Sequence, residues 1–195
     1  MMEPYQNFAP DDVYGALSEQ NRGRTVPQAA RDWFVANGVP PINLVKTWAG
    51  YYDMVLHDDV VFLDNGYFEF SRYREGNPEA ALTFVCWSQD GVAEDVCAWQ
   101  TMTGKIATWL GHARMLGEDN LLGPRLDGVL MVHADPLEWF RANRSGVVIL
   151  NRERAAPLLR EAGTLGVSTL EIAKKLKKVL AVELPAILIP DGARA

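Results

Sequence analysis

Three histidines are the residues of this chain best suited to acid–base or metal chemistry. His57 stands directly before Asp58 and Asp59, and His133 stands two residues before Asp135. An imidazole beside a carboxylate can act as a general base or bind a divalent metal. No His-x-x-x-His or Cys-x-x-Cys spacing accompanies these residues. We therefore expect no metal site and no cofactor, and interpret Asp58 and Asp59 as a solvated turn and Asp135 as a helix cap.

The third histidine, His112, begins a Gly-rich loop of about 18 residues, 111–128. Loops of this length are uncommon without a function, and binding residues concentrate on loops. A cleft beside this loop would use His112, Arg114 and His133 as candidate ligand-binding residues. The favoured interpretation is a solvated connector that its leucines attach to the core. These leucines are Leu116, Leu121, Leu122 and Leu126.

The sequence shows no signature of nucleophilic or nucleotide chemistry. Gly-x-Ser-x-Gly, Gly-x-Gly-x-x-Gly and the phosphate-binding loop motif are all absent. Cys86 and Cys97 fall on neighbouring predicted strands, and we interpret them as small core residues. Whether the protein is an enzyme stays open, and a non-enzymatic protein is favoured.

Two further groups of side chains suggest binding surfaces. Trp87, Trp99 and Trp109 fall on three successive predicted strands and would form a stacking platform if they shared an exposed face. Burial in the core is the more usual outcome for such residues. Four lysines between Lys174 and Lys178 lie on the polar side of a predicted helix. We interpret them as a solvated face, with a nucleic-acid contact as the alternative.

Composition excludes several classes of protein. The chain has 195 residues, 48% of them hydrophobic and 23% charged, which is typical of a folded globular protein and excludes a disordered one. Its apolar runs are shorter than the ~18–20 residues that span a membrane. The net charge of −6 argues against nucleic acid as a partner. Unpatterned cysteines and a start without a basic and apolar leader predict a cytoplasmic protein.

The first 57 residues predict helices. Pro10 and the acids after it begin a helix that ends near residues 21–23. Thr25 and Gln28 form a capping box for a second helix, which ends at residues 37–38. A third helix is predicted by apolar residues at helical spacing: Ile42, Val45, Ala49, Tyr52 and Val55.

Residues 59–110 predict an antiparallel meander. Asn65 and Gly66 between two apolar runs are a strong hairpin signal. A nearly continuous apolar run over 81–87 is typical of a central strand. The five predicted strands are 60–63, 67–70, 81–87, 96–99 and 106–110.

The remainder of the chain, 129–195, alternates strand and helix. Strands are predicted at 129–132, 147–150 and 186–189, and the link between the first two permits a parallel crossover. Asp135, Asn151 and the Ser168 capping box each predict the start of a helix, and the second reaches Glu161.

These elements predict an α+β protein. N-terminal helices lead into an antiparallel β-meander, and a C-terminal β-α-β-α-α-β portion extends that sheet or packs on it. We expect a single domain over 1–195. The alternative is two subdomains, 1–110 and 129–195, joined by the loop 111–128.

Two segments resemble a known family. The first runs from Ala98 through Gly104 to Gly117, and the second from His133 to Leu150. Together they resemble an uncharacterised family of bacterial proteins, some linked to mobile elements, over roughly residues 85–190. That family has no established activity, so the resemblance implies a bacterial cytoplasmic protein and assigns no site.

The favoured function is therefore a non-enzymatic bacterial accessory or protein-interaction module, with a protein partner or a second copy of itself and without a membrane partner. The first alternative is a small-molecule-binding protein or a small enzyme with a cleft near the loop 111–128. A weaker alternative is a nucleic-acid-associated protein that uses the Lys174–Lys178 face.

Overall fold

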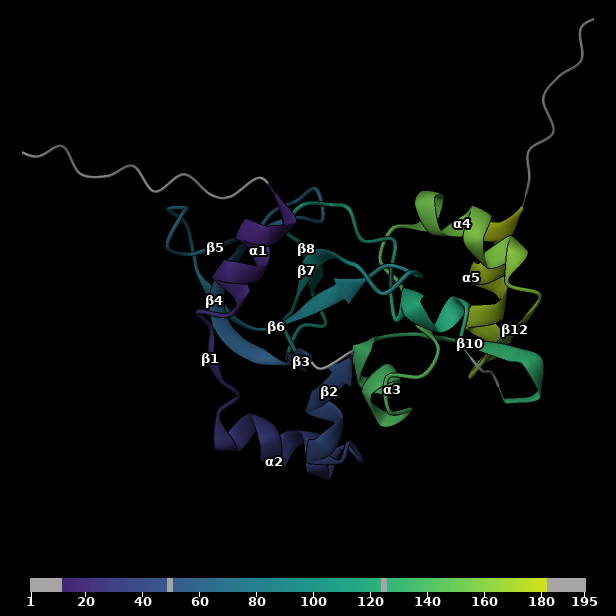
Figure 1. Cartoon of the computed structure of the whole chain (residues 1–195), viewed down its shortest axis with the longest axis horizontal. Coiled ribbons are helices and arrows are strands. Elements are labelled where there is room, and N and C mark those ends of the chain that lie inside the picture. Colours follow the sequence, from purple (N-terminus) through teal and green to yellow (C-terminus); the bar gives the residue numbers. More distant parts are fainter. Residues whose placement is uncertain (1–11, 49–50, 124–125, 182–195) are drawn as a thin grey trace, which may run out of the picture.

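The computed structural model describes residues 12–48, 51–123 and 126–181. They form the predicted α+β fold, with N-terminal helices, an antiparallel sheet and a C-terminal unit of alternating strands and helices (Figure 1). Within these residues, no helix combines the length and the apolar character needed to cross a membrane.

The first two predicted helices are confirmed as α1 (Val13–Gln20) and α2 (Gln28–Ala36). Pro10 lies outside the described residues, and Asp12 caps α1 by accepting the N–H of Gly15 at 2.6 Å. The capping box predicted for α2 is wrong. Thr25 belongs to the short strand β1 (Arg24–Thr25), and Pro27 precedes the helix without a side-chain hydrogen bond.

The third predicted helix is also wrong. The chain makes one 3-10 turn, Pro41–Leu44, and then a hairpin of β2 (Val45–Trp48) and β3 (Tyr51–Met54). Ala49 lies outside the described residues. β-Branched and aromatic residues dominate both strands, and their preference for extended backbone outweighs the helical spacing of the apolar positions.

The predicted meander is confirmed as an antiparallel sheet with strand order β1-β4-β6-β7-β8, in which β5 pairs with β4. Its main strands are β4 (Leu56–Phe62), β5 (Phe68–Phe70), β6 (Glu79–Trp87), β7 (Ala93–Trp99) and β8 (Ile106–Thr108). His57, Asp58 and Asp59 lie within β4, so the interpretation of this segment as a solvated turn before the strand is wrong.

Side chains of β6 and β7 alternate between two buried clusters because successive strand residues point to opposite faces. Cys86, Cys97 and Trp99 lie in the first cluster, which confirms the two cysteines as core residues. Trp109 lies in the second, on the other face. Trp99 and Trp109 are 3% and 7% exposed, so they are core residues and share no exposed platform with the half-buried Trp87.

The C-terminal unit forms a second sheet that packs beside the first and does not extend it. It runs β10 (Val129–His133), α3 (Pro136–Arg141), β11 (Val147–Ile149), α4 (Arg152–Glu161), β12 (Thr164–Val167) and α5 (Leu170–Leu180). The strand order is β12-β10-β11-β9, where β9 (Met115–Leu116) comes from the long loop. β11 and β12 are both parallel to β10, which confirms the predicted crossover.

β12 is missing from the prediction because it is short and contains Gly166, a residue uncommon in strands. A Cβ at this position would lie 2.5 Å from the sulfur of Met131, so a larger residue would force the side chains of β10 to shift. Asp135 and Asn151 cap their helices as predicted, whereas Thr169, one residue after Ser168, caps α5. The predicted strand 186–189 lies outside the described residues.

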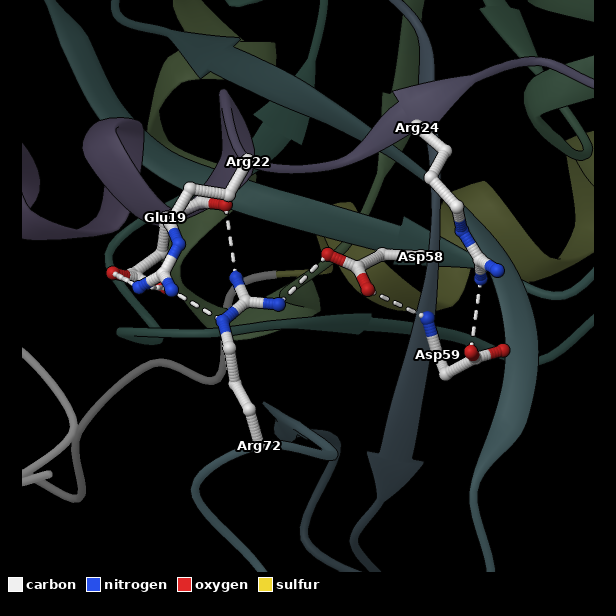
Figure 2. A network of polar contacts seen from close by, with 6 residues as sticks. All are labelled: Glu19, Arg22, Arg24, Asp58, Asp59 and Arg72. Carbon is white, nitrogen blue, oxygen red and sulfur yellow. Dashed lines mark hydrogen bonds and ion pairs between the residues drawn. The ribbon is translucent and has the colours of Figure 1, made fainter.

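Arg72 connects three elements of the N-terminal half (Figure 2). Its guanidinium donates to the carboxylate of Glu19 on α1 at 2.6 Å and to that of Asp58 on β4 at 2.9 Å. It also lies 4.0 Å from the centre of the Phe70 ring. Arg72 thus holds α1 against the sheet.

Glu19 is the buried acid of this network. Burial disfavours its charged form, but hydrogen bonds from Arg72, Arg22 and Tyr73 outweigh that cost and hold the pKa of Glu19 below its usual value. The carboxylate is therefore ionised at neutral pH and depends on its cations.

Replacement of Arg72 by alanine is expected to lower the free energy of unfolding by about 3 kcal/mol, because the half-buried carboxylate of Asp58 loses its cation and the buried carboxylate of Glu19 keeps only Arg22. Urea denaturation at neutral pH measures this change. Arg24→Ala is the matched control. Its ion pair with Asp59 is 62% and 47% exposed, so the loss should stay below about 1 kcal/mol. Equal losses of stability in the two variants would contradict the conclusion that Arg72 holds α1 against the sheet.

Candidate functional site

Asp95 fixes the position of the segment that leads from β8 of the first sheet to β9 of the second. We call this segment, residues 109–114, the passage. The β7 residue Asp95 is fully buried, and its carboxylate accepts four backbone N–H groups. They belong to Val96 at 2.8 Å, Leu110 at 2.9 Å, His112 at 2.7 Å and Ala113 at 3.2 Å. Asp95 is absent from the predicted site residues, because the predicted strand begins one residue later, at Val96, and the neighbouring Glu94 gives the pair the pattern of a solvated turn.

Both the side chain and the backbone carbonyl of Arg114 form hydrogen bonds. Its guanidinium donates to both carboxylate oxygens of the buried Glu118, and to Glu94 at 3.4 Å. Its carbonyl oxygen accepts the N–H groups of Leu150 and Asn151, both at 3.0 Å. Arg114 thereby positions the start of α4, and its charge is already neutralised by two acids.

Glu94 is the half-buried acid of this cluster. Burial raises the pKa of its carboxyl, and the negative charge of Glu118 adds to the rise, while Arg114, Arg154 and His112 oppose it. The side chain of His112 is exposed beside these charges, and its backbone N–H belongs to the Asp95 network. The structure therefore brings His112 and Arg114 into one charged cluster.

His133 stands apart from that cluster, at the end of β10. Its Nε2 donates to the carbonyl oxygen of Ser145 at 2.8 Å, so Nδ1 of the neutral ring is a hydrogen-bond acceptor. Gly146 follows with φ +81°, and a Cβ there would lie 2.5 Å from the carbonyl oxygen of Met131 and 2.9 Å from Nε2 of His133. The α3–β11 loop consequently packs directly on the histidine.

His133 lines a pocket of about 190 Å³ at the carboxyl ends of the parallel strands β10 and β11. We call it the basic pocket, because His133, Arg152 and Lys175 form its polar wall. Its apolar wall consists of Val132, Ile149, Ile172, Leu176 and Val179. The carboxyl ends of parallel strands are the usual ligand-binding edge of such sheets.

The two faces of the second sheet carry different helices. Val148 packs with α3 residues in the first buried cluster, whereas Val147 packs with α4 and α5 residues in the third. Between the ends of β10 and β12, the carboxylate of Glu138 accepts the N–H of Ala134 at 3.0 Å and the hydroxyl of Ser168 at 3.3 Å. The carboxylate of Glu138 thus occupies the space between the ends of β10 and β12. The basic pocket lies on the other face of the sheet, beside α4 and α5.

A second pocket, of about 160 Å³, lies where the sequence predicts a cleft beside the loop 111–128. It is lined by the hairpin turn at 65–67, by β8, by Gly111 and by Asn151, among others. No charged side chain of the described residues lines it, and neither do the three predicted ligand-binding residues. Ligand binding by His112 and Arg114 stays a prediction.

The long loop itself is more ordered than the sequence predicts. Besides β9 it contains two 3-10 turns, Glu118–Leu121 and Leu126–Gly128. Leu116 and Leu121 are buried as expected, but Leu122 is 70% exposed. In the described ranges, no three histidine, cysteine or acidic side chains are placed to hold a metal ion.

No protein family, curated protein or solved structure matches this chain. The resemblance to an uncharacterised bacterial family therefore stays a prediction.

Asp95→Ala is expected to lower the free energy of unfolding by at least about 3 kcal/mol, because several backbone N–H groups would lose their acceptor. Chemical denaturation checks the value. The control Asp90→Ala removes an exposed acid from the turn before β7 and should change stability by less than about 0.5 kcal/mol. A loss at Asp95 no larger than the control's would show that the carboxylate does not hold the passage.

Glu118→Gln and Glu94→Gln are expected to act in opposite directions at neutral pH. Glu118 is the main partner of Arg114, so its loss should cost about 3 kcal/mol of stability. Glu94→Gln should increase stability, because the folded state resists ionisation of this carboxyl.

The pH dependence of the Glu94→Gln effect follows from the raised pKa of Glu94. Its protonated form stabilises the fold below the usual value of 4.5, and this contribution is lost as the pH rises through the raised value. The advantage of Glu94→Gln over the unmodified protein should therefore shrink as the pH falls toward about 4. Unfolding curves over this pH range would contradict the assignment if the advantage grew instead.

Proposed function

We propose that the protein is a non-enzymatic ligand-binding protein that holds a small anionic molecule in the basic pocket. The observation that carries this proposal is the convergence of two cations, Arg152 and Lys175, on one pocket beside His133 at the carboxyl ends of two parallel strands. Polar groups that converge on an apolar pocket are the general mark of a small-molecule site.

The charges of the pocket are available to a ligand. Arg152 forms no hydrogen bond or ion pair with the described part of the chain. Lys175 pairs with Glu171 at 2.8 Å, but the two side chains are 66% and 76% exposed. Such a pair contributes less than about 1 kcal/mol, so an anion can take its place at low cost.

Contact with a protein partner is the second candidate function. Exposed apolar side chains favour it: Val45 and Met54 face each other across the β2–β3 hairpin, and Ile42 in the adjoining turn is 73% exposed. The burial of Trp99 and Trp109 removes the aromatic platform that also motivated this function.

Nucleic-acid association is the weakest of the three. All four lysines of α5 between Lys174 and Lys178 are exposed, as the sequence predicts. The same helix face also carries Glu171, and the chain as a whole has a net charge of −6. Steeply salt-dependent binding of DNA or RNA would favour this function over a small ligand.

Inorganic phosphate and acetate are the simplest probes of the basic pocket. Each should stabilise the protein in thermal unfolding, because a ligand present at 100 times its Kd adds about 2.7 kcal/mol to the folded state. Isothermal titration calorimetry should show at least about tenfold weaker binding in the double variant Arg152→Gln/Lys175→Gln, which lacks two cations.

The double variant Lys174→Gln/Lys178→Gln is the matched control, since it removes two positive charges from α5 outside the pocket lining. It should bind both anions as the unmodified protein does. Equal losses in the two double variants would show that only net charge matters. Absence of anion binding in the unmodified protein would refute the proposal.

A further inference from the structure

The basic pocket has two chemically distinct walls. Ile172, Leu176 and Val179 recur on one side of α5 at helical spacing, and Lys175 stands among them at the polar wall. Leu176 belongs to the third buried cluster. Ile172 and Val179 are half-buried and outside that cluster, so they keep apolar surface that a ligand can cover.

The volume limits the size of the ligand. An apolar cavity of about 150 Å³ holds a molecule the size of benzene. The basic pocket measures about 190 Å³. Its space therefore holds about six to eight non-hydrogen atoms of a ligand.

The charges favour one negative group. Lys175 is partly compensated by Glu171, so Arg152 is the main uncompensated cation of the polar wall. The planar guanidinium of an arginine matches the two oxygens of a carboxylate. A multiply charged anion would require more cations and would be repelled by Glu171, the ion-pair partner of Lys175.

On the basis of the proposed function, we propose that the ligand is a short aliphatic monocarboxylate of about four to six carbons, which with its two oxygens has about six to eight non-hydrogen atoms. Its carboxylate binds Arg152 and Lys175, and its chain lies on Ile172 and Val179.

A chain-length series tests this inference on the full-length protein. Affinities for acetate, butanoate, hexanoate, octanoate and dodecanoate are measured by calorimetry, with hexanol and inorganic phosphate as controls. Affinity should rise about fourfold for each methylene up to hexanoate, and then level off when the pocket is full. Hexanol, which has the same chain without the charge, should bind at least about tenfold more weakly than hexanoate.

Val179→Thr separates the two walls. The threonine side chain has nearly the same shape but carries a hydroxyl, so hexanoate should bind about threefold to tenfold more weakly while acetate binds unchanged. The matched variant Lys175→Gln should weaken acetate and hexanoate by the same factor. Far-ultraviolet circular dichroism confirms that each variant is folded.

The outcomes distinguish this inference from the proposed function. If acetate, phosphate and hexanoate bind equally well, the pocket binds anions but the monocarboxylate inference is wrong. If affinity still rises from octanoate to dodecanoate, or if hexanol binds as tightly as hexanoate, the inference is also wrong. If no anion binds, both the inference and the proposed function are wrong.

Discussion

The arrangement of the two sheets depends on the buried carboxylate of Asp95. By accepting the N–H groups of Leu110, His112 and Ala113, it fixes the direction in which the chain leaves the antiparallel sheet. Such a carboxylate is tolerated inside a protein because backbone donors replace its water. The chain then continues to Arg114, whose carbonyl oxygen fixes the start of α4, so the position of the basic pocket depends on the same passage.

A shared aromatic core completes the junction between the two sheets. Phe140 of α3 stacks on Trp99 at 6.2 Å between ring centres and meets Phe34 of α2 edge-on at 5.7 Å. The side-chain amide of Asn43 donates to the carbonyl oxygen of Phe140 at 2.8 Å, and Arg144 donates to the carbonyl oxygen of Asn43 at 3.0 Å. Figure 1 shows α3 between the first sheet and β10, where these contacts place it.

This junction explains why the candidate site lies where it does. The face of the second sheet that carries Val148 is committed to packing against the first sheet through α3. The opposite face, beneath α4 and α5, belongs to a separate cluster and reaches solvent at the carboxyl ends of the strands. One face of the second sheet thus packs against the first sheet, and the other face can bind a ligand.

The sequence by itself determined the features that depend on neighbouring residues. Asp135 and Asn151 cap their helices as predicted, because a cap requires only backbone groups within the first turn. The turn at Asn65 and Gly66 and the alternating strands are local in the same sense.

Only the tertiary structure decided the rest, because it depends on contacts between residues far apart in the chain. β2 and β3 pair as a hairpin despite the helical spacing of their apolar residues, and the short β12 is a strand because it pairs with β10. Of the three predicted ligand-binding residues, the structure places His133 alone in the basic pocket, and it supplies Arg152 and Lys175 from two later helices. Pairing between strands far apart in the chain brings these side chains together, and the spacing of residues along the sequence does not predict that pairing.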